Sequence, residues 1–116
     1  FEDSVSFSVE KADSLTIQAP IKRLKGELTA VQSLQDEGVL TILKGYPVTK
    51  DSYIEELQTH ISIFQLKHQI YSRNKEISQT ADQATIQKLK QENAKGFSEL
   101  KSLYQKILSV SSSCFT

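Results

Sequence analysis

The chain has no tryptophan, no methionine and a single cysteine, Cys114. One cysteine cannot form a disulfide within the chain, and its use suits a reducing, intracellular compartment, nuclear or cytoplasmic. No apolar run approaches the roughly 20 residues that cross a bilayer, and no charged-then-apolar leader opens the chain. We therefore expect no membrane contact. Because the chain begins with Phe1 rather than Met, we expect it to be a domain excised from a longer protein or a processed product.

Neither positive nor negative charge is in excess, since 14 Lys and Arg balance 14 Asp and Glu. This balance argues against a chain built to hold phosphate backbones, so nucleic acid is not an expected partner. Two small basic groups, one at 22–25 and one at 88–95, are interleaved with acids and are typical of solvated helix faces. At 116 residues, one domain with a modest core is expected.

The stretch 49–71 predicts the central helix of the fold. Thr49 is a natural N-cap, and Asp51 places a carboxylate in the first turn, where the helix dipole favours negative charge. Apolar positions then recur every three or four residues, as on a helix packed against other helices. They are Ile54, Leu57, Ile61, Phe64, His68 and Tyr71. Ile63, Leu66 and Ile70 widen the stripe, which indicates a helix covered on more than one side.

A second heptad register predicts a last helix near 84–110. Its inward positions are Ile86, Leu89, Asn93, Gly96, Leu100, Leu103, Ile107 and Val110, flanked by Phe97, Tyr104 and Leu108. Asn93 at a core position is the kind of polar residue that fixes register or oligomeric state at some cost in stability. Gly96 leaves room for a large opposing side chain, for which Phe64 or Tyr71 is the expected occupant. We expect this helix to pack antiparallel against the central one, or the exposed seam to form a homodimer.

Between these landmarks the pattern is less regular. Pro20 suits a first helical position and opens a predicted helix that breaks or kinks around 36–38. Val39, Leu40, Ile42 and Leu43 form a short apolar piece that should be buried. Gly45 can supply a left-handed cap, and Pro47 stops the helix. The polar stretch 72–85 is either a loop or a thinly packed helix extension, and Thr80 and Asp82 can cap the last helix.

Residues 1–19 alternate in hydrophobicity and are predicted to form an extended arm, or a β-hairpin, lying on the helices or ordered by a partner. The arm residues expected to bind are Val5, Phe7 and Val9. The predicted organisation is thus an arm at 1–19, a helical domain at 20–110 and a flexible tail at 111–116. The predicted fold is all-α: a three- to four-helix bundle or helical hairpin with coiled-coil-like packing and an extended N-terminal arm.

Catalytic and metal-binding patterns are missing. His60 and His68 lie eight residues apart, about 12 Å along a helix, which is too far to share one ion, and no HExxH or CxxC accompanies them. No glycine-rich loop could cradle a phosphate. Carboxylate pairs such as Glu55 and Glu56 suit solvated surface. We therefore expect a non-enzymatic protein without cofactor or metal.

The segment GVLTILKGYPVTKDSYIEEL resembles the N-terminal helical domain of transcription elongation factors, shared by elongin A, mediator and integrase-binding relatives. In that family an apolar helix ends in a leucine-rich turn followed by Pro, Ile or Val, and Thr. Leu43, Pro47, Val48 and Thr49 fill those places over about twenty residues. The resemblance implies a nuclear domain that binds short disordered motifs of other transcription factors.

The sequence favours a scaffold or interaction domain of an intracellular multiprotein assembly, binding protein partners through its helical seam or its arm. The alternative is the transcription-factor domain that the resemblance implies. The predicted interaction seam consists of Ile54, Leu57, Ile61, Phe64, Tyr71, Ile86, Leu89, Asn93, Leu100, Leu103 and Ile107.

Overall fold

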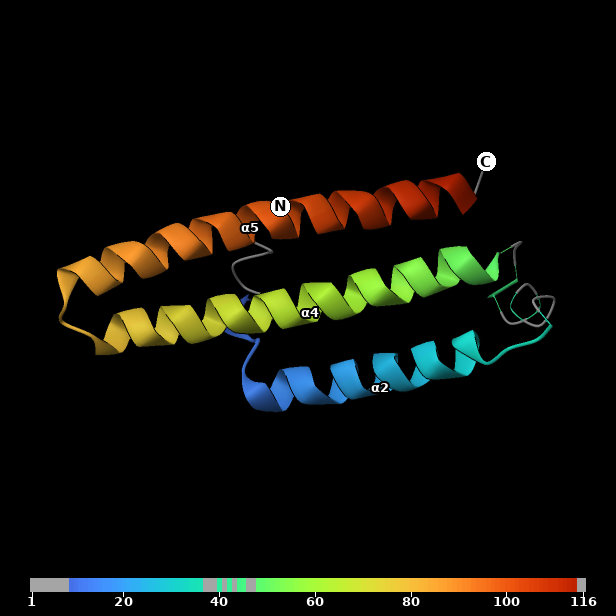
Figure 1. Cartoon of the computed structure of the whole chain (residues 1–116), viewed down its shortest axis with the longest axis horizontal. Helices are drawn as coiled ribbons and strands as arrows, with labels where there is room; N and C mark the ends of the chain where they lie inside the picture. Colours follow the sequence, from blue (N-terminus) through green and yellow to red (C-terminus); the bar gives the residue numbers. More distant parts are fainter. Residues whose placement is uncertain (1–8, 37–39, 41, 43, 46–47, 115–116) are drawn as a thin grey trace.

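The protein is built from helices arranged side by side (Figure 1). The computed structural model describes residues 9–36, 40, 42, 44–45 and 48–114, of which 109–114 are described by their backbone alone. Within these residues the three long helices are α2 (Ser14–Gln32), α4 (Lys50–Gln79) and α5 (Gln83–Cys114), and there is no strand. The all-α prediction is confirmed. The molecule measures 56 × 27 × 19 Å, so the helices form an elongated layer.

Helix α4 lies between the other two, antiparallel to each of them (Figure 1). One cluster of buried side chains joins α4 to α2 and consists of Leu24, Val31, Leu40, Val48, Tyr53, Leu57 and Ile61. The other joins α4 to α5 and consists of Val9, Ile63, Leu66, Ile70 and Leu100. Each fully buried aliphatic side chain contributes about 1.5–3 kcal/mol relative to an exposed one. The two clusters together hold the three helices side by side.

The stripe on α4 that contains Leu57 and Ile61 packs against α2. The predicted antiparallel packing of the central helix against the last one is confirmed, but most of the α4 residues that make it lie outside this stripe. The residues that meet α5 are Ile63, Leu66 and Ile70, which widen the stripe in the sequence. Ridges on opposite sides of one helix are what a central helix needs, because it must bury apolar surface against two neighbours.

Helix α2 begins six residues before Pro20, so both the arm boundary at residue 19 and Pro20 as first helical residue are wrong. The Asp13 side chain caps the helix by accepting the Thr16 backbone N–H at 2.8 Å. Ile17 is buried and precedes Leu24 by two helical turns, whereas Leu15 is 85% exposed. The alternation seen in the sequence around Leu15 and Ile17 is therefore part of a helix and not of a strand.

In the connection from α2 to α4, the predicted left-handed conformation of Gly45 is confirmed and the predicted burial of Ile42 is wrong. Helix α2 ends at Gln32, before the predicted break. Leu40 is buried as predicted, but Ile42 is 80% exposed, so its predicted burial is wrong. Gly45 has a φ of 77°, the left-handed conformation expected of it. The predicted burial of Val39 and Leu43 concerns positions outside the described residues.

Thr49 caps α4 as predicted, because its hydroxyl accepts the Ser52 backbone N–H at 3.1 Å. Lys50 Nζ donates to the backbone oxygen of Leu34 at 3.0 Å and ties the start of α4 to the end of α2. Helix α4 then continues through the polar stretch to Gln79, so that stretch is mainly a helix extension.

A short turn at 80–82 connects α4 to α5. Asp82 lies just before α5 and accepts the Thr85 hydroxyl at 2.6 Å, a contact that lowers the pKa of its carboxyl group. Helix α5 starts one residue before the predicted position and continues to Cys114. The predicted end at Val110 is wrong, because the helical backbone continues through 111–114.

The N-terminal segment 9–12 lies on the α4–α5 pair. Val9 is 1% exposed in the α4–α5 cluster, and His68 Nδ1 lies 3.0 Å from the backbone oxygen of Ala12. Val9 and Glu10 have helical backbone geometry, and are not extended as predicted. The expectation that this segment packs on the helices holds at Val9, while Val5 and Phe7 lie outside the described residues.

Candidate interaction surface

Most of the predicted interaction seam is used inside the chain. Buried members are Leu57, Ile61, Leu89, Asn93 and Leu100, and partly buried members are Ile54, Phe64, Tyr71, Ile86, Leu103 and Ile107. The α4 members contact α2 at Ile54 and Phe64 and the α5 side at Tyr71, while Leu103 and Ile107 pack on the α4–α5 cluster. The seam residues thus form two different internal interfaces.

Asn93 is 6% exposed and donates a hydrogen bond from Nδ2 to Asn74 Oδ1 at 2.8 Å. It therefore pairs across α4 and α5 of the same chain. Its own Oδ1 is buried without a hydrogen-bond partner. A buried acceptor left in this state costs about 1–3 kcal/mol, so the pair is a polar position that the core tolerates at a cost.

Gly96 lies opposite Ile70. A Cβ at position 96 would be 3.0 Å from Ile70 Cγ1, and the predicted occupants, Phe64 and Tyr71, are both wrong. The close approach of α5 to α4 at this point leaves no room for an aromatic ring. Gly96 brings the two helices together and does not accommodate a large residue.

The histidines have structural contacts. His68 is partly buried with its ring nitrogen beside the Ala12 carbonyl, and His60 lies 3.9 Å from Glu56 one turn before it. In the part of the chain that the structure describes, no group of three or more His, Cys, Asp or Glu side chains could hold a metal ion. No helix among the residues searched is long and apolar enough to cross a membrane.

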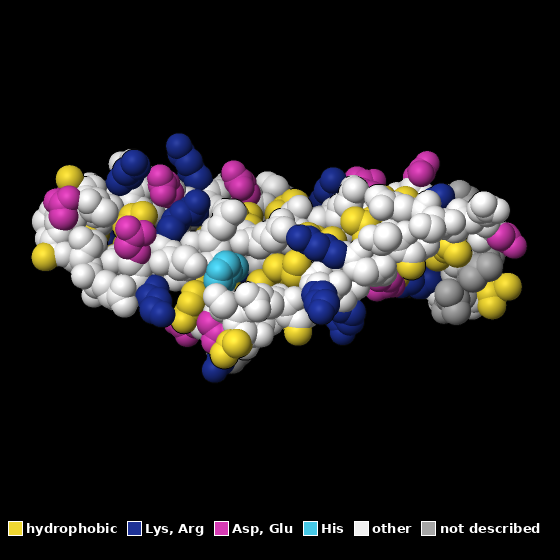
Figure 2. All heavy atoms as spheres, turned by 60° about the horizontal axis from the view of Figure 1, so that its bottom comes forward, with side chains coloured by type: hydrophobic (Ala, Val, Ile, Leu, Met, Phe, Trp, Pro, Cys, Tyr) yellow, Lys and Arg dark blue, Asp and Glu magenta, His cyan; other side chains and the backbone are white. Residues whose placement is uncertain are grey.

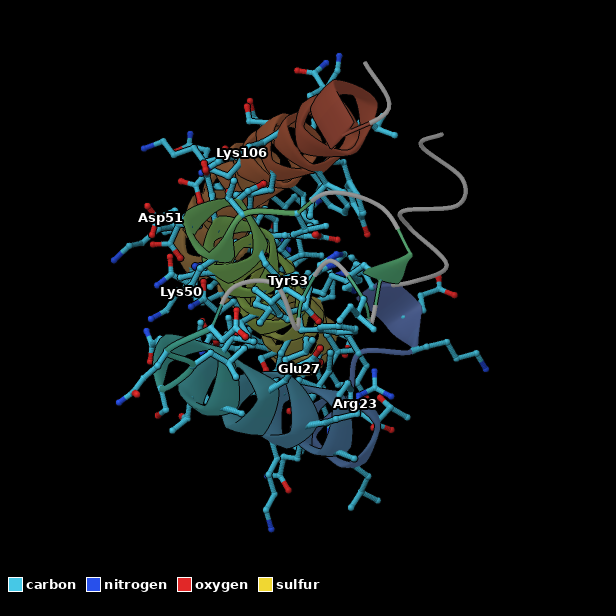
Figure 3. The ribbon with its side chains drawn as sticks, turned by 90° about the vertical axis from the view of Figure 1, so that its right-hand side faces the viewer. Arg23, Glu27, Lys50, Asp51, Tyr53 and Lys106 are labelled. Carbon is cyan, nitrogen blue, oxygen red and sulfur yellow. The ribbon has the colours of Figure 1, made fainter. Side chains whose placement is uncertain are left out.

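A hollow of about 400 Å³ lies beside the corner that leads into α4. Its lining includes Val31, Leu34 and Leu40, with Tyr53 and Lys44 at its polar side. The Tyr53 hydroxyl donates to Glu27 Oε1, and Lys44 Nζ lies 4.3 Å from the centre of the Tyr53 ring. Figure 3 shows Tyr53 of α4 next to Glu27 of α2. The hollow combines apolar lining residues with a few polar groups, a composition suited to binding a short peptide.

A second hollow, of about 500 Å³, lies between α4 and α5. It is lined by Ser62, Gln65, Leu66 and Gln69 of α4 and by Glu99, Ser102, Leu103 and Lys106 of α5, so polar residues and two leucines share its lining. Lys106 Nζ forms an ion pair with Glu55 at 3.1 Å on this side, and Arg73 with Glu92 at 3.5 Å. These charges are half-exposed, and pairs of that kind contribute about 0–1 kcal/mol.

Helix α5 carries another line of residues at helical spacing beside its buried seam. We call it the α5 stripe; it consists of Lys90, Ala94, Phe97, Lys101, Tyr104 and Leu108. Phe97 and Tyr104 are partly buried against the α4–α5 cluster, whereas Leu108 is 65% exposed. Lys90, Ala94 and Lys101 are also exposed. Apolar surface therefore continues around α5 beyond the part that α4 covers.

Lys67 of α4 adds a cation at the edge of the α5 stripe. Its Nζ lies 5.6 Å from the centre of the Phe64 ring and 5.3 Å from the centre of the Tyr104 ring. Cation–π contacts of this kind contribute about 0.5–1 kcal/mol at exposed sites. They also hold the ammonium group between the two helices.

The α5 stripe is the candidate interaction surface that the predicted site misses. The flanking residues Phe97, Tyr104 and Leu108 are recognisable in the sequence, but the predicted site contains only the inward register. The signal is the second series with steps of four and three residues from Lys90 to Leu108. Its lysines give this line of residues the composition of an ordinary solvated helix face.

Charged side chains of both signs are interspersed on the face shown in Figure 2, with apolar side chains between them. This mixture is typical of a solvated surface.

Comparison with known proteins finds no matching family model, no matching curated protein and no matching solved structure.

Proposed function

We propose that this protein is a non-enzymatic helical interaction domain, a scaffold of an intracellular multiprotein assembly, and that it binds partners through the α5 stripe. The observation that carries the proposal is the exposure of Leu108 at the end of the α5 stripe, next to the partly buried rings of Phe97 and Tyr104. Leu108 is 65% exposed although it lies on the same helix as Leu100, which is fully buried. A helix whose apolar surface extends past its internal neighbour has a side available to a second one.

The energetic argument concerns Leu108 and its neighbours. Covering one exposed leucine contributes about 1.5–3 kcal/mol, and Phe97 and Tyr104 each have further area to bury. Aromatic residues are also the side chains that concentrate binding energy at the centre of interfaces. Leu15 and Ile42 are more exposed than Leu108, but neither belongs to the α5 stripe.

Affinity purification of the tagged chain from cells, with quantitative mass spectrometry, tests this function. The Leu108→Asp variant should lose the proteins that the unmodified chain retains. Leu15→Asp is the matched control, because it places the same charge at an exposed leucine in the first turn of α2. It should retain them. Equal retention by both variants, or no protein retained by the unmodified chain, would contradict the proposal.

A second candidate is the transcription-factor type of domain that the resemblance implies. The hollow beside Lys44 and Tyr53 favours it, because it lies at the corner where a motif-binding groove is expected. Ala30→Trp would place a large ring at the lining of this hollow and should abolish binding of short disordered motifs there. An elongated dimer in small-angle scattering would remove this candidate.

A further inference from the structure

We infer that the partner of the α5 stripe is an acidic amphipathic helix of another protein. This inference rests on the proposed function and names the class of partner for the same surface. The surface consists of the α5 stripe together with Phe64 and Lys67 of α4. Its shape, its charge and the arrangement of its anchor residues each favour this partner.

The shape favours a helix over an extended peptide. Positions 90 to 108 form a line along α5 about 27 Å long, at 1.5 Å per residue. Side chains in such a line match the apolar face of a second helix, whose anchors recur with the same spacing. An extended peptide that adds a strand requires unpaired backbone groups, and the backbone of α5 here is engaged in its own helix.

The charge of the surface favours an acidic partner. Lys67, Lys90 and Lys101 form no ion pair within the described residues, and none has an acidic residue three or four positions away on its own helix. On the other side of the α4–α5 seam, by contrast, Lys106 and Arg73 are paired with carboxylates.

Among the described residues, other charges near this face do not supply the missing acids. On α4, Glu56 lies beside His60, and in the N-terminal segment Glu10 lines a hollow with Lys75. The lysines of the surface therefore remain available to carboxylates from outside, which steer association and fix its register.

Tyr104 is the central anchor. Lys101 precedes it by one turn, and Lys67 Nζ lies 5.3 Å from its ring centre. The contact with Phe64 at 5.6 Å also restrains Lys67, so less side-chain freedom is lost when a carboxylate binds. An acidic helix can then place an apolar side chain against Tyr104 and Leu108 and carboxylates against the two lysines.

The test uses a synthetic three-heptad peptide with leucine at positions a and d and glutamate at e and g. A second peptide carries lysine in place of each glutamate. Binding to the full chain is measured by fluorescence anisotropy at about 150 mM salt, where weak screened contacts are lost. The acidic peptide should bind and the basic one should not. The backbone amides whose NMR chemical shifts change on binding should be mainly those of Phe64, Lys67 and the α5 stripe.

Lys101→Glu should weaken binding of the acidic peptide at least tenfold. Lys88→Glu is the control, because Lys88 is also exposed on α5 but lies two residues before Lys90, on the opposite side of the helix. It should change the affinity less than twofold. Both sites are exposed, so neither variant should alter the thermal unfolding temperature much.

Equal binding of the two peptides, no binding of the acidic one, or equal effects of the two variants would overturn the inference. Binding that appears only after removal of residues 1–8 would also overturn it, because the chain's own N-terminal segment would then be the occupant. If proteins from cells still depend on Leu108 while the acidic peptide does not bind, the inference fails and the proposed function stands.

Discussion

Asn93 of α5 donates a hydrogen bond to Asn74 of α4 at 2.8 Å, across the part of the hairpin nearest the turn. The Oδ1 atom of Asn93 is buried beside it without a partner. The ion pair between Arg73 and Glu92 links the two neighbouring positions. This pair favours one alignment of the two helices, because a shift along them would leave the buried Asn93 amide without its partner.

Replacing Asn93 should therefore raise stability. Asn93→Leu removes the unpaired acceptor, and we expect the free energy of unfolding to rise by about 1–2 kcal/mol. Asn74→Ala should lower it by about 1 kcal/mol, since it leaves the whole Asn93 amide buried and unpaired. Urea unfolding measures both changes, and light scattering should detect association in Asn93→Leu if register is lost. A less stable Asn93→Leu variant would contradict this account.

Replacing Gly26 or Gly96 by alanine should change the stability in opposite directions. Gly26 on α2 has nothing within 4 Å of the position that a Cβ would take, so Gly26→Ala should stabilise by about 1 kcal/mol through helix propensity alone. Gly96→Ala gains the same propensity, but its Cβ would lie 3.0 Å from Ile70 Cγ1, and Ile70 is fully buried. We expect net destabilisation of about 1 kcal/mol. Thermal unfolding distinguishes the two, and in a double-mutant cycle Ile70→Ala, which removes both contacting carbons, should lower the cost of Gly96→Ala. Equal stabilisation by both alanines would show that the helices are not in contact at Gly96.

Burial predicts unequal effects for two charge insertions. Leu100 is fully buried, so Leu100→Asp places a carboxylate in the α4–α5 cluster and should cost several kcal/mol, enough to remove cooperative unfolding. Phe64 is only partly buried, and Phe64→Asp should leave a cooperative transition at lower temperature. Circular dichroism melting curves test the order. An unchanged melting temperature in Leu100→Asp is incompatible with the fold.

Acid should weaken both helix starts. The pKa of Asp13 lies below its ordinary value of 3.8, chiefly because the Thr16 backbone N–H donates to the carboxylate. The pKa of Asp82 is also lowered, chiefly by the Thr85 hydroxyl. Both carboxyl groups have a lower pKa in the folded chain than in the unfolded chain. The stability that they contribute is therefore present at pH values above the unfolded-state pKa and is lost as the pH falls through the folded-state pKa.

The double variant Asp13→Asn and Asp82→Asn should show a smaller fall in melting temperature between about pH 6 and pH 2.5, since asparagine caps helices without titrating. The matched control is Asp51→Asn, at an exposed carboxylate in the first turn of α4. An identical acid response in the double variant and the unmodified chain would exclude a capping contribution.

The helical class and the central helix are predictable from the sequence because the apolar spacing in 49–71 and 84–110 is regular and Thr49 is a strong cap. The pairing of the helices is less predictable. Periodicity shows that Leu57 and Ile63 both face a neighbour, but it does not say which neighbour. That choice depends on the position of α4 between the other two, which is a property of the whole chain.

The errors near Pro20 and Gly96 have local causes. Proline is a common first helical residue, yet the Asp13 cap starts α2 earlier, and packing of Ile17 and Leu24 offsets the hydrogen bond that Pro20 lacks. Gly96 fits either a large opposing side chain or a close helix approach. The α5 stripe is hidden for a different reason: its lysines lower the hydrophobicity of a line that Phe97, Tyr104 and Leu108 share.

Thiol accessibility on α5 tests the central claim most directly, namely that α4 covers one side of this helix and leaves Leu108 of the α5 stripe exposed. Cys114→Ser removes the only native thiol, and Leu100→Cys and Leu108→Cys are then compared in separate variants at low protein concentration. The account predicts that the thiol at position 108 reacts with a soluble reagent nearly as fast as in the unfolded chain. The thiol at position 100 should react more slowly by orders of magnitude. Similar rates at the two positions, or protection at position 108, would contradict it.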